Sequence, residues 1–112
     1  IAFVKNTGVP VMCCGEKMAE LTANTTDAAK EKHVPVVTVD GSNVHVEVGS
    51  TLHPMTEEHL IAFIVLVTEK GYQVAQLSAT DEPKADFAVA AGDKPLKVYE
   101  YCNLHGLWAA TI

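Results

Sequence analysis

The chain has 112 residues, which is enough for one domain with a hydrophobic core and too few for two domains of ordinary size. Hydrophobic residues make up 48% of it, its formal net charge is −6, and all eight of its basic residues are lysines. An acidic chain without arginine binds phosphate backbones poorly, and no apolar run reaches the roughly 18 residues that cross a bilayer. The composition therefore argues against nucleic acid and the membrane as partners.

The first 24 residues are predicted to form a short N-terminal segment without a core of its own. Two brief apolar runs, Val9–Met12 and Met18–Leu21, lie on either side of the sequence Cys13-Cys14-Gly15. Because the chain begins on the apolar run Ile1–Val4 rather than on methionine, we expect further residues upstream.

The three cysteines are Cys13, Cys14 and Cys102. An odd total does not make a disulfide framework, and adjacent cysteines rarely bridge each other. No secretory signal is recognisable, so we expect reduced thiols in a cytoplasmic protein. Reduced thiols are available as metal ligands.

The remainder of the chain is predicted to be all-β. A single helical turn is expected at Thr26–Lys30, where a capping threonine precedes good helix formers. Thr56–Glu58 could also begin a helix, but the β-branched and aromatic residues that follow favour a strand. The seven predicted strands are 36–39, 44–48, 60–67, 72–77, 86–90, 96–101 and 107–111. Short strands with short turns predict a seven-stranded immunoglobulin-like β-sandwich with a short N-terminal segment.

Four of the five histidines lie in loops or at strand ends, beside other polar or turn-forming residues. These are His33, His53, His59 and His105. His45 differs because it lies within the alternating run Val44–Val48 and shares a face with Glu47. Since alternate residues of a strand point to opposite faces, His45 is interpreted as a solvent-facing side chain.

The Cys102-x-x-His105 spacing places a thiolate and an imidazole close enough to bind one metal ion. Alone it is a weak signal, because zinc and copper sites use similar spacings. With the three other loop histidines it makes five potential donors, whereas structural zinc takes four and blue copper takes two histidines, one cysteine and a weak axial methionine. Four imidazoles and one thiolate suit a square-pyramidal iron whose sixth position is open to a small molecule.

Three motifs closely resemble, in order and spacing, those of the superoxide reductases, also called desulfoferrodoxins and neelaredoxins. The motifs are Ala28–Val36, His53–His59 and Cys102–Trp108, and the resemblance covers about residues 9–110. It implies reduction of superoxide to hydrogen peroxide at a mononuclear Fe(His)4(Cys) centre, with electrons from an external donor such as rubredoxin. It also implies a homodimer or homotetramer, in which 25–112 is the iron-binding superoxide reductase domain and 1–24 is the remnant of a desulforedoxin-like segment.

The resemblance also implies a role for each residue of the site. His33, His53, His59 and His105 would be the equatorial ligands of the iron, and Cys102 would be the axial thiolate. Lys32 would attract superoxide and organise water for protonation, and Glu31 would occupy the sixth position in the ferric resting state. Without the resemblance, the run Lys30-Glu31-Lys32 would be interpreted as a solvated loop.

Cys13 and Cys14 resemble the second half of the four-cysteine iron centre of two-iron relatives. The Cys-x-x-Cys pair that completes such a centre is absent from these 112 residues. Either the pair lies upstream or the protein is a one-centre form with two remaining thiols. We expect the first, so Cys13 and Cys14 are a possible second iron centre.

Two other classes of function stay open at this point. One is an electron-transfer or metal-storage sandwich that binds iron or copper without turnover, against which Lys32 beside an open site argues. The other is a metal-free binding module in which the histidines are incidental. Reaction with superoxide tests the first alternative, and metal analysis tests the second.

Overall fold

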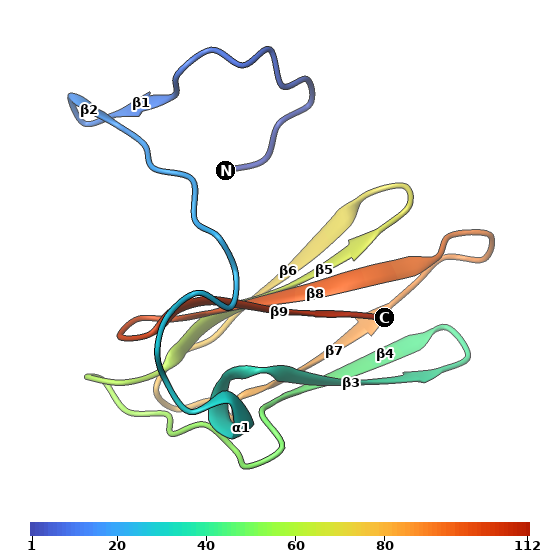
Figure 1. Cartoon of the computed structure of the whole chain (residues 1–112). Helices are drawn as coiled ribbons and strands as arrows, with labels where there is room; N and C mark the ends of the chain where they lie inside the picture. Colours follow the sequence, from blue (N-terminus) through green and yellow to red (C-terminus); the bar gives the residue numbers. More distant parts are fainter.

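The computed structural model describes all of residues 1–112 and shows two β-sheets packed face to face, with an N-terminal segment standing clear of them (Figure 1). The three-stranded sheet has the order β3-β4-β7, and the four-stranded sheet has the order β6-β5-β8-β9. Every pairing is antiparallel. The strands are β3 (Pro35–Asp40), β4 (Asn43–Val48), β5 (Ile61–Thr68), β6 (Tyr72–Gln76), β7 (Lys84–Ala88), β8 (Pro95–Cys102) and β9 (Gly106–Thr111). The predicted seven-stranded sandwich is confirmed.

The core lies between the sheets and follows from the alternation of side chains along each strand. On β4 the buried residues are Val44, Val46 and Val48, and on β5 the residues Ile64 and Leu66 face them from the other sheet. Burying one side chain of this size contributes about 1.5–3 kcal/mol relative to leaving it in water. The period of two therefore fixes which face of each strand turns inward.

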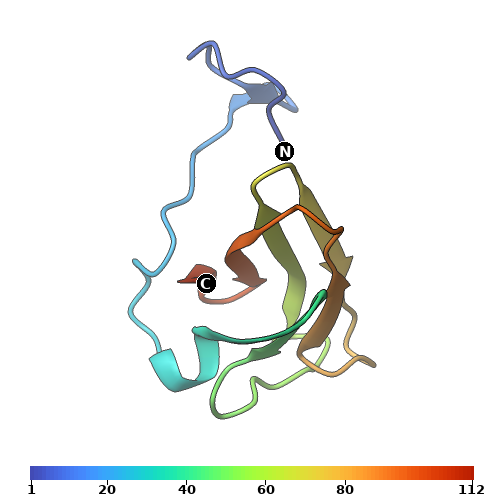
Figure 2. The ribbon, with the colours of Figure 1, turned by 90° about the vertical axis from the view of Figure 1, so that its right-hand side faces the viewer.

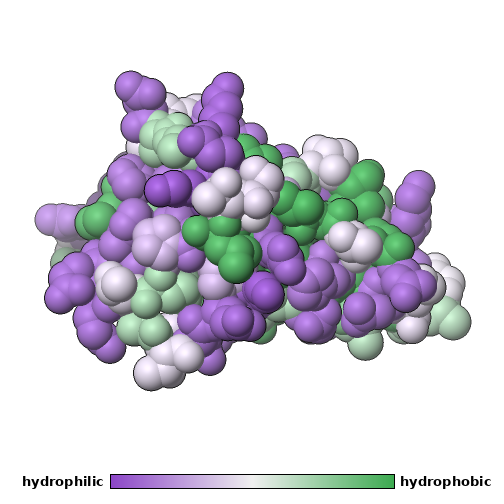
Figure 3. Space-filling model, turned by 90° about the horizontal axis from the view of Figure 1, so that it is seen from below, coloured by the Kyte–Doolittle hydropathy of each residue, from purple (hydrophilic) through white to green (hydrophobic).

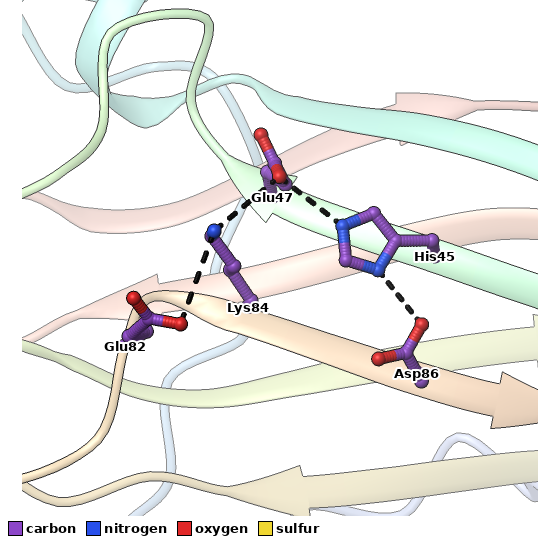
Figure 4. A network of polar contacts seen from close by, with 5 residues as sticks. All are labelled: His45, Glu47, Glu82, Lys84 and Asp86. Carbon is purple, nitrogen blue, oxygen red and sulfur yellow. Dashed lines mark hydrogen bonds and ion pairs between the residues drawn. The ribbon is translucent and has the colours of Figure 1, made fainter.

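The outer face of the three-stranded sheet is polar. His45 Nδ1 lies 2.7 Å from Asp86 Oδ1 on β7, and His45 Nε2 lies 3.2 Å from Glu47 Oε1 on its own strand (Figure 4). Lys84 joins Glu47 to Glu82 at 3.6 and 3.9 Å. His45 and Glu47 thus share the outward face, as the sequence predicts. Seen from below, on the side of this sheet, hydrophilic residues cover much of the surface, with hydrophobic residues in small groups between them (Figure 3).

Two elements differ from their predicted bounds by more than one residue. The only helical turn, α1, spans Lys30–His33 rather than Thr26–Lys30, because Ala29 is extended (φ −63°, ψ 110°) and the helical bonds begin at its carbonyl. Strand β7 begins at Lys84, two residues earlier than predicted, since Lys84 pairs with Glu47 across the sheet. No helix of the chain has the length and apolar character to span a membrane.

The N-terminal segment contains one small hairpin, β1 (Met12–Cys13) with β2 (Glu16–Lys17). Its turn is made by Cys14 and Gly15, which have φ values of 55° and 81°, as a two-residue hairpin turn requires. From there the chain runs down one side of the sandwich to α1 (Figure 2). On the way, the Asn24 side chain forms two hydrogen bonds with the backbone of Ala109 and so covers the free edge of β9.

Candidate metal centre

Five donor side chains from three separate parts of the chain meet at one end of the sandwich. His33 comes from α1, His53 and His59 from the β4–β5 loop, Cys102 from the end of β8 and His105 from the β8–β9 turn. One donor atom from each can be chosen so that all five lie within 4.8 Å of one another. Since bonds from a transition metal to nitrogen or sulfur measure about 2.0–2.3 Å, a set of this width fits around a single ion.

The four imidazole rings form a closed cycle. The neighbouring pairs are His33 with His53, His53 with His59, His59 with His105, and His105 with His33, at centroid distances of 4.8, 4.5, 5.1 and 4.7 Å. The rings of each pair meet edge to face, with interplanar angles of 73–86°. The four histidines therefore lie at the corners of a quadrilateral, and the fully buried Cys102 contacts two of them, with its Sγ 3.4 Å from His53 Nε2 and 3.7 Å from His105 Nδ1.

Hydrogen bonds to backbone carbonyls orient two of the rings. His33 Nδ1 donates to the Ala29 carbonyl, and His53 Nδ1 donates to the Pro54 carbonyl, each at 2.7 Å. Donation from Nδ1 fixes the tautomer and leaves the lone pair of Nε2 directed into the cluster. Such bonds are typical of histidines that ligate metals.

The ring nitrogens that point into the cluster have no hydrogen-bond donor available to them when the imidazoles are neutral. His59 Nε2 is buried without a hydrogen-bond partner. His105 Nδ1 lies 3.0 Å from His33 Nε2, the very atom whose lone pair points inward. Buried lone pairs that converge in this way are costly without a cation, so the donor set fits a bound metal ion.

Burial shifts the pKa values of three groups of the site, in favour of the ligand form for two histidines and against it for the cysteine. It lowers the pKa of His53 to about 4. Burial, followed by the positive charges of His105, His33 and Lys32, also lowers the pKa of His59. These two imidazoles are therefore neutral at pH 7 and available as ligands. Burial raises the pKa of Cys102, partly opposed by hydrogen bonds from the backbone N–H groups of Leu104 and His105.

Bonds between the loops hold the donors together, and the sequence did not single out the residues that make them. Asn103 accepts from the Leu60 N–H and donates to the Glu58 carbonyl, which ties the Cys102 turn to the loop that carries His59. Trp108 donates from Nε1 to the His105 carbonyl and stacks on His33 at 5.1 Å. Two features of the sequence could have indicated these residues: Asn103 is a polar residue between the ligands Cys102 and His105, and Trp108 is the only tryptophan and follows His105 by three positions.

The loop after β4 packs against α1 and forms hydrogen bonds with it. The Glu31 carbonyl accepts a hydrogen bond from the Thr51 N–H at 2.9 Å and one from the Ser50 hydroxyl at 3.2 Å. Gly49 is buried in the same place, where any Cβ would meet the backbone of α1. This packing sets the position of His33 and Lys32.

Glu31 and Lys32 are both exposed on α1, beside His33. Lys32 is close enough for its charge to act on His59, which lies opposite His33 in the cycle of four imidazoles. Glu100 was not anticipated. It is fully buried two residues before Cys102, neither carboxyl oxygen has a partner, and burial raises its pKa to about 8, which makes it neutral at pH 7.

Cys13 and Cys14 are not part of this cluster. They lie on the exposed β1–β2 hairpin, far above α1 in Figure 1, with their Sγ atoms 3.2 Å apart. The structure therefore brings together five of the nine predicted site residues around one point, places Glu31 and Lys32 on the helical turn that carries His33, and leaves the two N-terminal cysteines elsewhere.

Comparison with known proteins gives consistent matches along the whole chain. The sequence model of the Desulfoferrodoxin family matches residues 25–111. A desulfoferrodoxin of Clostridium acetobutylicum is 46% identical over 113 residues, covering 100% of this chain and 87% of that protein. The crystal structure of the superoxide reductase from Treponema pallidum has a TM-score of 0.88 and 46% identity, covering 97% of this chain and 90% of that one. The one-iron superoxide reductase from Giardia intestinalis has a TM-score of 0.63 and 35% identity, covering 74% of this chain and 98% of that one.

Proposed function

Because the chain belongs to the desulfoferrodoxin family, we propose that it is a superoxide reductase. In the reaction O2•− + e− + 2 H+ → H2O2, superoxide takes up one electron and two protons. The observation that carries the proposal is the closed cycle of four imidazoles with a buried thiol in contact with it. Five donors would hold a redox metal ion and leave room for one further ligand, which would allow the ion to react with a small molecule.

The proposed ligand atoms are Nε2 of His33, His53 and His59, Nδ1 of His105 and Sγ of Cys102. When bound, iron supplies the redox centre that passes one electron to superoxide. The chain holds the ion with neutral imidazoles, while the raised pKa of Cys102 means that its thiol gives up a proton as the metal binds. Cys102 is fully buried whereas His59 and His105 are partly exposed, so the substrate would approach from the side where these two histidines lie.

Lys32 is proposed to attract superoxide and to organise the water that delivers protons. The chain carries a net charge of −6, so the attraction must come from a local positive charge beside the metal. The action of Lys32 on the pKa of His59 supports this placement. Glu31, the neighbouring exposed residue, is proposed to cover the open side in the oxidised resting protein and to withdraw on reduction.

The donor and the setting of the protein complete the proposal. The electron comes from a small external carrier such as rubredoxin, and three free cysteines fit the reducing environment of the cytoplasm. Residues 25–112 are the iron-binding domain, which is supported by the start of the family match at residue 25, and residues 1–24 are the remnant of a desulforedoxin-like segment. The protein assembles as a homodimer or homotetramer.

Cys13 and Cys14 are proposed to supply two thiolates of a second, four-cysteine iron centre. Their adjacent and exposed sulfur atoms support this role. The other two thiolates are not among the 112 residues, so this sequence alone is expected to bind one iron per chain. Iron analysis of the purified protein tests the count, and a ratio of two in this 112-residue form would contradict it.

The visible spectrum of the iron-loaded protein tests the ligand assignment. A band in the red that appears on oxidation and bleaches on reduction is expected from charge transfer between thiolate and iron, and Cys102→Ser should abolish it. His59→Gln should lower the iron content, whereas the matched variant His45→Gln, outside the cycle, should retain it. Bound iron without this band would show that Cys102 is not a ligand.

Pulse radiolysis tests the reaction itself. Lys32→Ala is expected to slow the reaction with superoxide about tenfold or more, because it removes the local attraction for the anion. Glu31→Ala and the distant control Lys94→Ala should leave the rate of encounter unchanged. Equal rates for wild type and Lys32→Ala would refute the role of the lysine, and iron that does not react with superoxide would leave a metal-binding sandwich without turnover.

A further inference from the structure

Trp108 contacts two of the proposed ligands, which come from different parts of the chain. Its indole ring stacks on His33 of α1, with the ring centroids 5.1 Å apart and the planes 27° from parallel. Its Nε1 donates a hydrogen bond of 3.1 Å to the carbonyl of His105, in the β8–β9 turn. His33 and His105 are neighbours in the cycle of imidazoles, at a centroid distance of 4.7 Å. One side chain thus fastens two adjacent corners of the quadrilateral.

These contacts distinguish Trp108 from an ordinary core residue. It is 1% exposed, yet it is not a member of the hydrophobic cluster that fills the space between the sheets. The pairing of β8 with β9 places it opposite Glu100, whose buried carboxyl oxygens have no hydrogen-bond partner. The indole N–H nevertheless goes to the backbone of a ligand. A buried tryptophan needs a partner for this group, and here the partner is part of the metal centre.

The stack removes the remaining freedom of the His33 ring. The hydrogen bond from His33 Nδ1 to the Ala29 carbonyl, at 2.7 Å, fixes one edge of the ring. A single bond of this kind still allows the ring to tilt about the bond. The indole face of Trp108 prevents the tilt, because the ring could turn only by leaving that face or by colliding with it. His33, itself buried, is therefore held in its edge-to-face position toward His53 and His105.

Rigid rings matter because zinc competes with iron for any site built of imidazole and thiolate. Among divalent ions, Zn²⁺ binds such donors more tightly than Fe²⁺, so a site that takes iron must select by geometry. Zinc prefers four ligands at the corners of a tetrahedron. To reach that arrangement here, one of the five donors would have to leave, and the remaining rings would have to turn out of their closed cycle. Rings that cannot turn therefore disfavour zinc.

From these observations we infer that Trp108 is a positioning residue that makes the site selective for iron over zinc. By holding His33 and His105 at adjacent corners, it preserves an arrangement that accepts five donors and opposes its collapse into a four-ligand tetrahedron. The inference rests on the ligand set of the proposed function and adds to it the basis of the choice of metal. Trp108 is not itself a donor, so it acts only through the two histidines.

Two substitutions of Trp108 and one matched control test the inference. Trp108→Leu removes both the stack and the hydrogen bond, whereas Trp108→Phe keeps an aromatic face for His33 and removes only the N–H. The control Phe87→Leu also replaces a buried aromatic residue. Phe87, however, belongs to the hydrophobic cluster and pairs with Val44, at the end of β4 away from the loop that carries His53.

The dissociation constants for Fe²⁺ and for Zn²⁺ are measured separately, by transfer of each metal from the loaded protein to a chelator in the absence of oxygen. Trp108→Leu should weaken the binding of Fe²⁺ about tenfold to a hundredfold, the usual loss when a partner that orients metal ligands is removed. The binding of Zn²⁺ should weaken much less or become tighter, so that the preference shifts towards zinc. Trp108→Phe should shift the preference less in the same direction, and Phe87→Leu should leave it unchanged.

The ratio of the two dissociation constants separates selectivity from general stability. Equal weakening of both metals in Trp108→Leu would overturn the inference, as would an equal change of the ratio in Phe87→Leu. If Trp108→Leu does not fold, Trp108→Phe carries the comparison, and an unchanged ratio in it overturns the inference. A wild type that binds iron without the thiolate-to-iron band would contradict the ligand set of the proposed function and the inference with it. An unchanged ratio with the band present would overturn the inference alone.

Discussion

Gly49→Ala is expected to weaken the protein and disturb the metal centre, although Gly49 carries no functional group. A Cβ at this position would lie 2.7 Å from the Glu31 carbonyl oxygen, 3.0 Å from the Lys32 carbonyl carbon and 3.1 Å from the Val34 carbonyl oxygen. All three atoms belong to the backbone, so no side chain can swing away to relieve the contact. Either α1 or the loop after β4 must move.

The cost follows from the contacts that this movement breaks. Overpacking of a buried site costs about 1–3 kcal/mol. The Glu31 carbonyl also accepts hydrogen bonds from Thr51 and Ser50, and each bond that is lengthened costs up to about 1 kcal/mol more. We therefore expect a loss of about 2–3 kcal/mol in the free energy of unfolding. Since α1 carries His33 and Lys32, the thiolate-to-iron band should shift and the reaction with superoxide should slow.

Gly71→Ala is the matched control. Gly71 has no atom within 4 Å of its would-be Cβ and no positive φ, so the same substitution should change the stability by no more than about 0.5 kcal/mol, or raise it slightly through the unfolded state. Urea unfolding of the iron-loaded proteins measures both stabilities, and optical spectra report on the site. If Gly49→Ala matched Gly71→Ala in stability and spectrum, the argument that the β4 loop positions α1 would be wrong.

Two further predictions concern the polar contacts outside the metal centre. Hydrogen bonds from Asp86 and then Glu47 raise the pKa of His45 above its ordinary value of 6.5, so the stability that this contact adds is fully present below pH 6.5 and is lost as the pH rises through the raised pKa. In the wild type the free energy of unfolding should therefore fall as the pH rises through this pKa, and in His45→Gln this fall should be absent. The difference should be less than about 1 kcal/mol, because the groups are exposed. Identical urea titrations of both proteins across this pH range would contradict the prediction. Asn24→Ala removes both side-chain bonds to Ala109 and should cost about 1–2 kcal/mol, with faster amide hydrogen exchange at Ala109, and unchanged exchange would show that the edge of β9 does not need this cover.

The strands could be predicted because the chain alternates strictly where one sheet face is buried. The run Asn43–Val48 places valines inward and His45 with Glu47 outward, and the structure has this arrangement. The start of β7 could not be predicted in the same way, because Lys84 becomes part of a strand only by pairing with Glu47, which is distant in the sequence, and the local pattern does not show this. The helical turn was misplaced because capping preferences do not account for the extended Ala29, whose carbonyl is taken by His33.

At the metal centre, too, some features could be predicted from the sequence and others could not. The motifs predicted which histidines and which cysteine come together, because their spacing and order are characteristic of one family. The direction of each ring could not be predicted, since it depends on carbonyl groups, such as those of Ala29 and Pro54, that only the folded loops present. Glu100 could have been noticed, because the alternation through Val98 and Cys102 places its carboxyl group on the inward face.

The contacts between the ligand loops indicate that the donor set is largely formed before a metal arrives. Thr51 bonds α1 to the loop after β4, and Asn103 bonds the Cys102 turn to the loop that carries His59. Each of the three parts of the chain that supply donors is thus fastened to another by bonds that do not involve the ion. Metal binding then requires little ordering of the backbone, and its main chemical cost is the proton that Cys102 must release.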